Sequence, residues 1–524
     1  MLLGVDMLRR KIVLLIAAFS VFVSSTIRAV EASENSAHHL VKEAIQVAGH
    51  KLDLRQLGSV QMSASILTRD LVEGEHTGEP YIVSMQTATV TDDLQNDARL
   101  AESIKTAANG QPVVVTRQLT VGDALQTEVS QDGKVLRSTR TLSSPSWEMR
   151  NPIRALLLAD RAADLRREGD ITFHDSLQHA VSFVYDGYRI RLYLDAKMKL
   201  LTATESTIAF GHATSADVAW NALGDVQERT EFVLWDIVDG MRYPTQWDTY
   251  RDNVLLQTTT VSAAHTNVPV PQDSFTLSPE TKREVERLKN TSIDGITLGE
   301  AIAGAPNPNK SPEEIAPGIV QLPNSWYTTL IRQEDGIVII DAPISSSYSK
   351  RVIEEARRRF PGLPIKGVIT STAFFWHIAG VREYAANHIP IYVRDANRST
   401  VERILNSPHT LVPDDLSMHP VHPVIRPVSE RTVIGHGKNA VVVMPIWLAA
   451  EPMLMTHIPD AHLLHTGEMI QPLGPNGSML YPESLLEIRD SVLYAKLQVD
   501  RLIGMHMSPT PWSVLEAAIR DAGA

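Results

Sequence analysis

The stretch that decides the fold is VITSTAFFWHIAGVREYAANHIPIYV, residues 368–393. Its first residues complete the apolar run IKGVITS, which predicts a buried strand followed by a short loop. AGVREYAAN then has the spacing of an amphipathic helix, and IPIYV predicts the next strand. Upstream, GIVIIDAP (336–343) predicts a strand and SSYSKRVIEEARRRF (346–360) predicts a helix. This order of strands and helices is that of an α/β domain.

The length and composition indicate a globular protein with more than one domain. At 524 residues the chain exceeds the usual size of a single core, so we expect two domains. Apolar residues make up 43% and charged residues 21%, which is typical of folded chains rather than disordered ones. The formal net charge is -12 and the pI about 5.8, with no basic stripe, so we expect no nucleic-acid partner.

The amino terminus predicts export. Basic Arg9, Arg10 and Lys11 precede the apolar run IVLLIAAFSVFV, and the residues that follow fit a signal-peptidase site after Ala32. The run is shorter than the roughly 20 residues that span a bilayer, and an uncleaved anchor is the alternative. We expect a signal peptide at 1–32 and a periplasmic or secreted protein that is soluble after cleavage. The chain has no cysteine, so its stability must rest on core burial rather than disulfides.

Residues 33–285 are mainly alternating in polarity and predict a β-rich domain. The stretch around the Asp186-Gly187 dipeptide reads as a hairpin, and helical patterns are confined to 38–49 and 151–165. A curved antiparallel sheet carrying helices follows from this pattern. Residues 286–317 then predict a linker, because GAPNPNKSPEEIAPG is rich in Pro and Asn.

Two stretches of this first domain, LYLDAKMKLLTATE and MRYPTQWDTYRDNVLLQTTTVSAAHTNVPVPQDSF, loosely resemble periplasmic lipoprotein carriers. That resemblance implies a concave sheet face that holds an acyl chain or another small apolar ligand. The alternative is that the apolar strand positions only pack onto the helices. The domain's histidines have no metal-ligand spacing, and we interpret them as surface or locally bonded residues. They include His174, His179, His212 and His265.

The second domain, residues 318–524, resembles the metallo-β-lactamase superfamily. The stretches that carry the resemblance are GIVIIDAP, LPIKGVITSTAFFWHIAGVREYAA, HTLVPDDL, MLMTHIPDAHLLHTGEM and LQVDRLIGMHMSPTPW. The resemblance implies an αββα sandwich, and the whole chain is then a two-domain α+β protein. It also implies a metal-dependent hydrolase site, whose positions can be compared one by one with this chain.

Most of the metal-ligand positions implied by the resemblance hold residues that do not bind metals. The loop's first two histidines become Thr372 and Phe374, its aspartate becomes Trp376, and the downstream histidine becomes Ala449. A zinc ion takes three or four N, S or O donors at about 2.0 to 2.3 Å, so the first metal position has no imidazole left. The aromatic side chains would instead fill the pocket. The resemblance therefore predicts a degenerate dizinc site.

Three implied ligands remain in the sequence. The loop's last histidine is His377, the bridging aspartate is replaced by Glu468, and the final histidine is His506. Two imidazoles and one carboxylate form a set that can hold one zinc or iron with open positions. The alternative is that the two histidines only hydrogen-bond Glu468 as a buried remnant, with no cofactor.

Other candidate groups have no support as a site. His462 and His465 point to different faces of an extended strand, His457 lies on the neighbouring strand, and the HPVHP loop with His419 and His422 reads as surface. Asp341 is interpreted as an organiser of its loop. The chain has neither cysteine nor a Gly-x-Ser-x-Gly elbow for covalent catalysis.

Two functions follow. The first is a non-catalytic protein that binds an apolar ligand or a protein partner. The second is a single-metal hydrolase of small esters or thioesters that uses His377, Glu468 and His506. A weaker third interpretation makes the fold a scaffold for assembly, which an exposed apolar patch would support. The sequence leaves open whether the protein is an enzyme.

Overall fold

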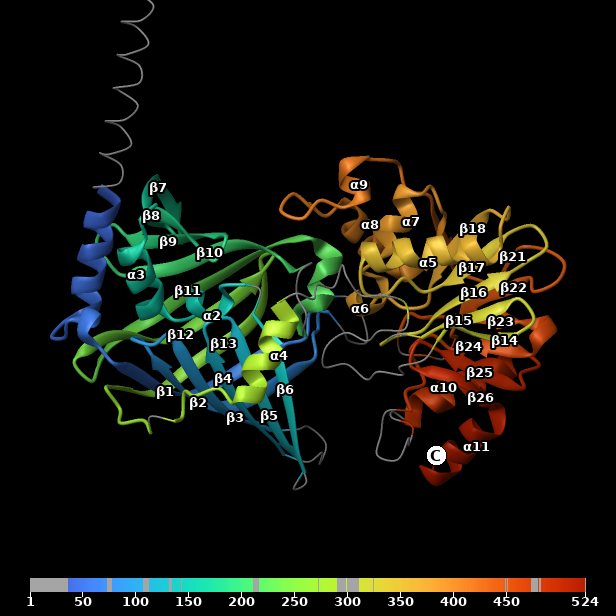
Figure 1. Cartoon of the computed structure of the whole chain (residues 1–524), viewed down its shortest axis with the longest axis horizontal. Helices are drawn as coiled ribbons and strands as arrows, with labels where there is room; N and C mark the ends of the chain where they lie inside the picture. The colour runs from blue at the N-terminus through green and yellow to red at the C-terminus, as the bar shows by residue number, and fades with distance from the viewer. Residues whose placement is uncertain are drawn as a thin grey trace, which may run out of the picture.

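A computed structural model describes residues 36–72, 78–106, 113–131, 134–142, 144–210, 216–271, 273–289, 298, 311–323, 325–447, 449, 451–472, 479 and 482–523. The predicted signal peptide at 1–32 lies outside these residues, as does most of the predicted linker at 286–317. Figure 1 shows the two lobes of the chain, the first in blue to green and the second in yellow to red. Among the described residues, no helix combines the length and the apolar character needed to cross a membrane.

The first lobe is built on a thirteen-stranded sheet in which every neighbouring pair is antiparallel. Its order is β6-β5-β4-β3-β2-β1-β13-β12-β11-β10-β9-β8-β7. The first and last strands of this lobe, β1 and β13, therefore pair in the middle of the sheet. The predicted hairpin at Asp186-Gly187 joins β8 to β9. The strands are β1 (Ser59–Arg69), β2 (Val83–Asp93), β3 (Ala98–Thr106), β4 (Val114–Val121), β5 (Ala124–Gln131), β6 (Lys134–Thr141), β7 (Arg166–Phe173), β8 (Ser176–Tyr185), β9 (Tyr188–Asp195), β10 (Leu201–Ala209), β11 (Asp225–Val238), β12 (Met241–Arg251) and β13 (Val254–Thr266).

Helices cover one face of this sheet and bury its core. Both helices expected from the sequence are present, one at 36–49 and the other as α3 (Pro152–Arg161). α3 begins where its sequence directs, because the Asn151 side chain accepts hydrogen bonds from the backbone N–H groups of Ile153 and Arg154 and Pro152 stands at the first helical position. The remaining helical segments are η1 (Leu54–Gln56), α2 (Ser146–Met149), η3 (Ala216–Leu223) and α4 (Pro279–Lys289).

The second lobe contains two sheets. The seven-stranded sheet comprises β14 (Glu313–Ala316), β15 (Ile319–Leu322), β16 (Thr328–Arg332), β17 (Ile337–Ile340), β18 (Ile365–Thr370), β19 (Ile391–Arg394) and β20 (Ile425–Val428) in that order. The six-stranded sheet comprises β21 (Thr432–Ile434), β22 (Val441–Pro445), β23 (Leu454–Ile458), β24 (Leu463–His465), β25 (Arg501–Gly504) and β26 (Met507–Pro511). Strands β17 to β20 are parallel, as the alternation of strands and helices in the sequence predicts.

Three buried clusters make this lobe a helix–sheet–sheet–helix arrangement. One cluster joins the two sheets and includes Ile340 and Ile503, a second joins the first sheet to α5 and α7, and a third joins the second sheet to α10 and α11. The helical segments are α5 (Ser346–Arg359), α6 (Phe375–Ile378), α7 (Val381–Ala386), η5 (Asp395–Asn397), α8 (Arg398–Asn406), α9 (Asp415–Met418), η6 (Pro459–Ala461), α10 (Pro482–Tyr494) and α11 (Trp512–Asp521).

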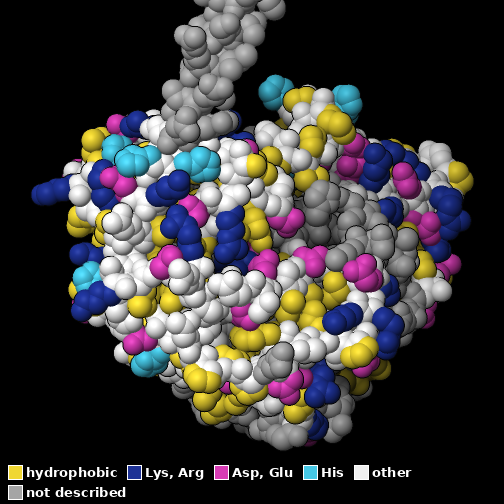
Figure 2. Space-filling model, turned by 60° about the vertical axis from the view of Figure 1, so that its left-hand side comes forward, with side chains coloured by type: hydrophobic (Ala, Val, Ile, Leu, Met, Phe, Trp, Pro, Cys, Tyr) yellow, Lys and Arg dark blue, Asp and Glu magenta, His cyan; other side chains and the backbone are white. Residues whose placement is uncertain are grey.

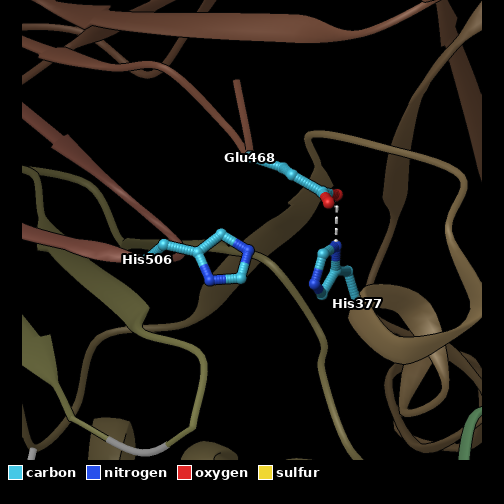
Figure 3. A group of neighbouring side chains, drawn as sticks. All are labelled: His377, Glu468 and His506. Atoms are coloured by element: carbon cyan, nitrogen blue, oxygen red, sulfur yellow. Dashed lines mark ion pairs between the residues drawn. The ribbon is translucent and has the colours of Figure 1, made fainter. Parts of the chain in front are cut away.

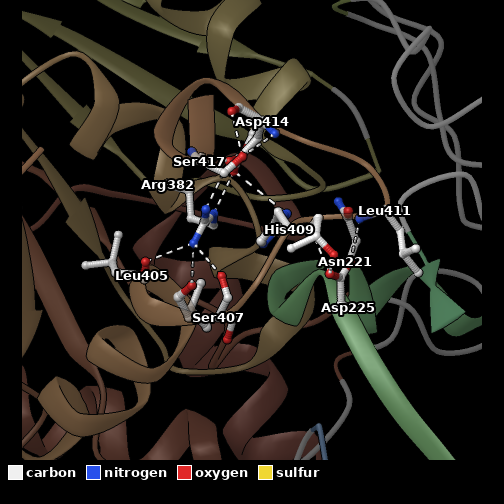
Figure 4. Close-up of polar contacts among 12 residues, drawn as sticks. Asn221, Asp225, Arg382, Leu405, Ser407, His409, Leu411, Asp414 and Ser417 are labelled. Atoms are coloured by element: carbon white, nitrogen blue, oxygen red, sulfur yellow. Dashed lines mark hydrogen bonds and ion pairs between the residues drawn. The ribbon is translucent and has the colours of Figure 1, made fainter. Parts of the chain in front are cut away.

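The two lobes share a continuous interface. Trp220 of η3 packs edge-on against Phe375 of α6, with ring centroids 6.2 Å apart, inside one buried cluster. Asp225 accepts hydrogen bonds from the backbone N–H groups of Thr410 and Leu411, at 2.7 and 3.2 Å, and from the Thr410 hydroxyl (Figure 4). The sequence predicted two domains joined by a linker and did not indicate how the domains are oriented, so this interface could not be read from it.

α4 extends to Lys289 and β14 starts at Glu313, so described elements occupy both ends of the stretch 286–317 interpreted as linker. Charged side chains of both signs are interspersed over the face shown in Figure 2, with hydrophobic side chains between them. This mixed surface agrees with the lack of a basic stripe in the sequence.

Candidate functional site

The stretch 368–393 folds as its pattern predicts and places His377 in the interior. β18 ends at Thr370 and α6 begins at Phe375, with four residues between them. Asp341, which follows β17 and has a φ of +70°, accepts a hydrogen bond at 2.7 Å from the backbone N–H of Ser371. Burial raises the pKa of Asp341 to about 7. Asp341 therefore organises the loop, as expected.

The structure brings the three remaining ligand candidates together (Figure 3). His377 comes from α6, Glu468 from the segment after β24, and His506 from the turn between β25 and β26. Their ligand atoms all lie within 4.8 Å of one another. His377 Nδ1 is 2.6 Å from Glu468 Oε2, and the rings of the two histidines meet edge to face at a centroid distance of 5.5 Å.

Burial dominates the electrostatics of this cluster. His377 and Glu468 are only 2% and 3% exposed, and burial raises the pKa of Glu468 well above its usual value. Burial, with the neighbouring His377, lowers the pKa of His506 to about 3. Two unprotonated acceptor atoms 2.6 Å apart would repel each other, so at least one of His377 and Glu468 is protonated when no metal is bound.

Aromatic rings surround the cluster. Trp326 lies 5.4 Å from His377 and 5.5 Å from Trp376 by ring centroids, and Phe374 lies 6.2 Å from His377. Phe374 is 7% exposed and packs in the cluster of the second sheet, with Ala449 against the same cluster. These rings shield His377, whereas His506 is only partly buried.

The predicted degenerate positions hold side chains with structural contacts. The Thr372 hydroxyl is buried and accepts a hydrogen bond at 3.2 Å from the backbone N–H of Phe374. Trp376 is partly buried and packs on the large cluster that joins α5 and α7 to the first sheet. None of Thr372, Phe374, Trp376 and Ala449 contributes to the group of side chains with metal-ligand geometry.

The cluster has the donor set of a single-metal site. Two imidazoles and one carboxylate suit zinc or iron. His506 Nε2 is buried and has no hydrogen-bond partner among the described residues. A metal would satisfy this atom, although the 4.8 Å spread of the donors requires them to move closer for bonds of about 2.0 to 2.2 Å.

The other histidines of this lobe lie elsewhere. His457 Nε2 is 2.9 Å from the Gln498 carbonyl oxygen, and His462 Nδ1 is 3.1 Å from Asp500. His465 is fully buried, with Nε2 3.6 Å from Asp341 Oδ2. His419 and His422 are exposed, as the HPVHP loop predicts.

Two of the four histidines named in the first lobe have local carboxylate partners. His174 Nε2 lies 2.8 Å from Glu231, and His179 Nδ1 lies 2.8 Å from Asp170. His265 is exposed, while His212 falls outside the described residues. The interpretation of His174 and His179 as locally bonded agrees with these contacts.

Sequence reasoning missed a group of cationic side chains in the first lobe. Arg69, Lys105, Arg140, Arg150 and Arg251 line one cavity there. They come from β1, β3, β6, β12 and the end of α2, so no local motif connects them. Only the pairing of the strands brings them together.

Comparisons with known proteins give fold-level similarity only. No protein-family model matches the chain, and no curated protein matches its sequence. Among solved structures, the DIM-1 metallo-β-lactamase has a TM-score of 0.31 at 11% identity, covering 41% of this chain and 97% of that one. A metallo-β-lactamase from Pontibacter korlensis has a TM-score of 0.31 at 10% identity, covering 40% and 96%.

FIM-1 from Pseudomonas aeruginosa, described as a mono-zinc form, has a TM-score of 0.30 at 12% identity and covers 40% of this chain and 94% of that one. The chain is thus similar, over about two fifths of its length, to proteins of the metallo-β-lactamase fold.

Proposed function

We propose that the chain is an exported, non-catalytic binding protein whose C-terminal domain has the metallo-β-lactamase frame without a working dizinc centre. The observation that carries this proposal is that the residues at the missing metal-ligand positions make structural contacts instead. Phe374 and Ala449 pack in a hydrophobic core, and the Thr372 hydroxyl is engaged with the loop backbone. With no imidazole at these positions, a first metal would lack its protein ligands.

The burial of two of the three remaining candidate ligands supports the same function. A catalytic zinc keeps one coordination position open to water or substrate. Here His377 and Glu468 are almost fully buried, and Trp326 and Phe374 lie against the imidazole. We interpret the short His377–Glu468 contact as a proton-sharing link that ties α6 to the segment after β24.

The binding role is assigned to the first domain. Its broad antiparallel sheet with helices on one face is the arrangement that the resemblance to lipoprotein carriers implies. Apolar ligands and protein partners both remain compatible with this role. Export rests on the basic and apolar pattern of residues 1–32.

A single-metal hydrolase is the second candidate, and the unpartnered His506 Nε2 favours it. His377, Glu468 and His506 would hold the ion, and the bound metal would supply a Lewis acid and an activated water. The protein side chains would orient the ion and exclude bulk water from it. The substrate would have to pass the rings of Trp326 and Trp376.

Cobalt(II) titration with an ester and thioester hydrolysis screen separates the two candidates. We expect no cobalt absorption band and no hydrolysis above buffer. A band that is lost in His506→Gln but kept in His422→Gln, an exposed histidine, would support the single-metal candidate. Metal-dependent hydrolysis that follows the same pattern would overturn the non-catalytic proposal.

Export is tested separately by fusing residues 1–40 to an alkaline phosphatase that is active only outside the reducing cytoplasm. We expect activity from the fusion and none when Leu14 and Leu15 are replaced by arginine, which interrupts the apolar run. An inactive fusion would contradict export.

A further inference from the structure

The short helix α6, which carries His377, lies at the edge of the second lobe that faces the first lobe (Figure 1). Trp220 of η3 meets Phe375 of this helix edge to face, inside the large buried cluster that joins the two lobes. Leu71 and Val72, which follow β1, pack against the same cluster. Two segments of the first lobe, η3 and the residues after β1, therefore pack where the second lobe places α6.

The backbone of α6 is also hydrogen-bonded to these two segments. The Phe375 N–H donates to the Val72 carbonyl oxygen at 3.3 Å. The side-chain amide of Asn221, in η3, donates to the Ile344 carbonyl oxygen at 3.2 Å. The Ile344 N–H donates in turn to the Trp376 carbonyl oxygen at 3.0 Å. The first lobe thus reaches two consecutive residues of α6, one directly and one through Ile344.

Ile344 holds a strained backbone conformation. Its φ is +75°, which β-branched residues rarely adopt. Such a conformation persists only where the surrounding structure fixes it, and it is found most often beside functional sites. Here the hydrogen bonds from Asn221 and to Trp376 fix Ile344 on both sides. The strained residue therefore stands between the first lobe and the helix that carries His377.

The position of His377 depends on the position of α6. Phe375 is the first residue of the helix and His377 the third, so a movement of this single turn moves the imidazole with it. His377 Nδ1 lies 2.6 Å from Glu468 Oε2, and its ring meets that of His506 at a centroid distance of 5.5 Å. Contacts this short tolerate little displacement, because a gap of about 1 Å removes a large part of the attraction between packed atoms.

The first-lobe side of this contact borders open space. Leu71, Val72 and Trp220 also line the cavity of about 550 Å³ that holds the cationic side chains of the first lobe. A segment with fewer packing neighbours can open locally while the rest of the protein stays folded. Loss of one contact should therefore loosen α6 without unfolding either lobe.

We propose that the first lobe positions His377 through α6, with Val72, Trp220 and Asn221 as the positioning residues. The candidate site of the second lobe is then complete only when the two lobes are packed together. The proposal goes beyond the proposed function, because it applies both to a non-catalytic cluster and to a single-metal site. Its test needs neither a metal nor a ligand.

Four variants of the full chain are compared with the native protein. Trp220→Ala removes the ring that meets α6, and Trp220→Phe keeps a ring there. Asn221→Ala removes only an amide donor from a partly buried position. Trp247→Ala is the matched control, because Trp247 is also a buried tryptophan of the first lobe, 3% exposed against 5% for Trp220. Trp247 belongs to a different buried cluster, beside Phe232 and Tyr243.

Two measurements on the folded variants report on α6. Hydrogen exchange followed by mass spectrometry measures the opening of the backbone at 375–378. A nuclear Overhauser effect between the imidazole rings of His377 and His506, assigned with His506→Gln, reports whether His377 keeps its place. A purely structural role of Trp220 in its own lobe would change neither readout.

We expect Trp220→Ala to speed exchange at 375–378 by roughly fivefold or more and to weaken or abolish the ring–ring effect. Asn221→Ala should speed the same exchange by roughly twofold or more, because Ile344 loses one of its two hydrogen bonds. Trp220→Phe should stay close to the native protein in both readouts. Trp247→Ala should lower the overall stability and leave both readouts unchanged.

Several results would overturn the proposal. Native exchange at 375–378 in both Trp220→Ala and Asn221→Ala would show that the first lobe does not hold α6. Equal changes in Trp220→Ala and Trp247→Ala would show only a general loss of stability. Faster exchange with an unchanged ring–ring effect would show that His377 is positioned by the second lobe alone. Absence of the ring–ring effect from the native protein would overturn the placement of His377 itself.

Discussion

Replacing Arg382 with leucine is expected to destabilise the second lobe strongly. The guanidinium lies on α7, donates two hydrogen bonds to Asp414 at 2.6 and 2.9 Å, and donates three more to the carbonyl oxygens of Ile404, Leu405 and Ser407 (Figure 4). Arg382 therefore joins the stretch 368–393 to the end of α8 and to the loop that contacts the first lobe.

The magnitude follows from burial. The Arg382 and Asp414 side chains are 3% and 11% exposed, and removing one partner of a buried pair costs about 3 to 5 kcal/mol. For a domain of about 200 residues this lowers Tm by roughly 6 to 20 °C. Burial alone would raise the pKa of Asp414, but the hydrogen bonds and charge of Arg382 outweigh it and hold that pKa well below its usual range.

The stabilisation by the Arg382–Asp414 pair should depend on pH in a definite direction. Because the folded pKa of Asp414 is depressed, the stabilisation by the pair is complete above the unfolded value of about 3.9 and is lost as pH falls through the folded value. The difference in stability between the native protein and Arg382→Leu should therefore narrow in strong acid. At neutral pH it should be at its largest.

Urea unfolding followed by circular dichroism measures this effect. The matched control is Arg398→Leu, whose guanidinium pairs with Glu402 one turn away but is 56% exposed, so its loss should be under about 1 kcal/mol. The double variant Arg382→Leu/Asp414→Leu should recover part of the stability, since no carboxylate is left unpaired. A loss in Arg382→Leu no larger than in Arg398→Leu would refute the reasoning.

Three further predictions concern other buried groups. Gly224→Ala should destabilise the interface by about 2 kcal/mol or more, because Gly224 has a φ of +64° and a Cβ there would lie 2.4 Å from the Pro408 oxygen. The same variant should speed hydrogen exchange of the backbone N–H groups at 409–411, and unchanged exchange would contradict this. Burial, with the charge of Arg382, lowers the pKa of His409 to about 4, so the free energy of unfolding should decrease as pH falls from about 6.5 through 4. In urea titrations, His409→Gln should remove about 3 kcal/mol of this decrease. Burial raises the pKa of Glu148 to about 8, so the free energy of unfolding should decrease as pH rises from about 4.5 through 8. Glu148→Gln should abolish this decrease, and a variant whose stability still falls over that pH range would contradict the assignment to Glu148.

Local sequence patterns predict the second lobe well because its signals are local. The run at 365–370 is a strand whose last four residues are buried, and the spacing of AGVREYAAN becomes α7. Asp335-Gly336 joins β16 to β17 as a turn dipeptide should. The pairing of β1 with β13 is different, since it joins segments about 200 residues apart that carry no mutual signal.

The candidate site was predictable only through the resemblance. His377, Glu468 and His506 come from three separated segments, and nothing in their spacing indicates that they meet. Their surroundings were partly predictable, because Phe374 and Trp376 stand next to His377 in the sequence. Trp326 was not, although its ring lies 5.4 Å from that imidazole.

The interface could not be predicted because it depends on how the two lobes pack, and the cationic cavity because it depends on strand register over long separations. Asp225 meets Thr410 only when the lobes pack together, and Arg69 shares a cavity with Arg251 only after the sheet has formed. Polar residues at these places look like ordinary solvated strand positions in the sequence. In the folded protein Asp225 and Arg251 are buried, so their polar groups make interactions that the sequence pattern does not indicate.

Metal content is the most direct test of the central claim that the second lobe is a hydrolase frame without a working metal site. The measurement is elemental mass spectrometry of the untagged protein beside a His377→Ala/His506→Ala variant. The account predicts no stoichiometric zinc or iron in either protein. About one zinc or iron per chain, lost in the variant, would contradict it and support the single-metal enzyme.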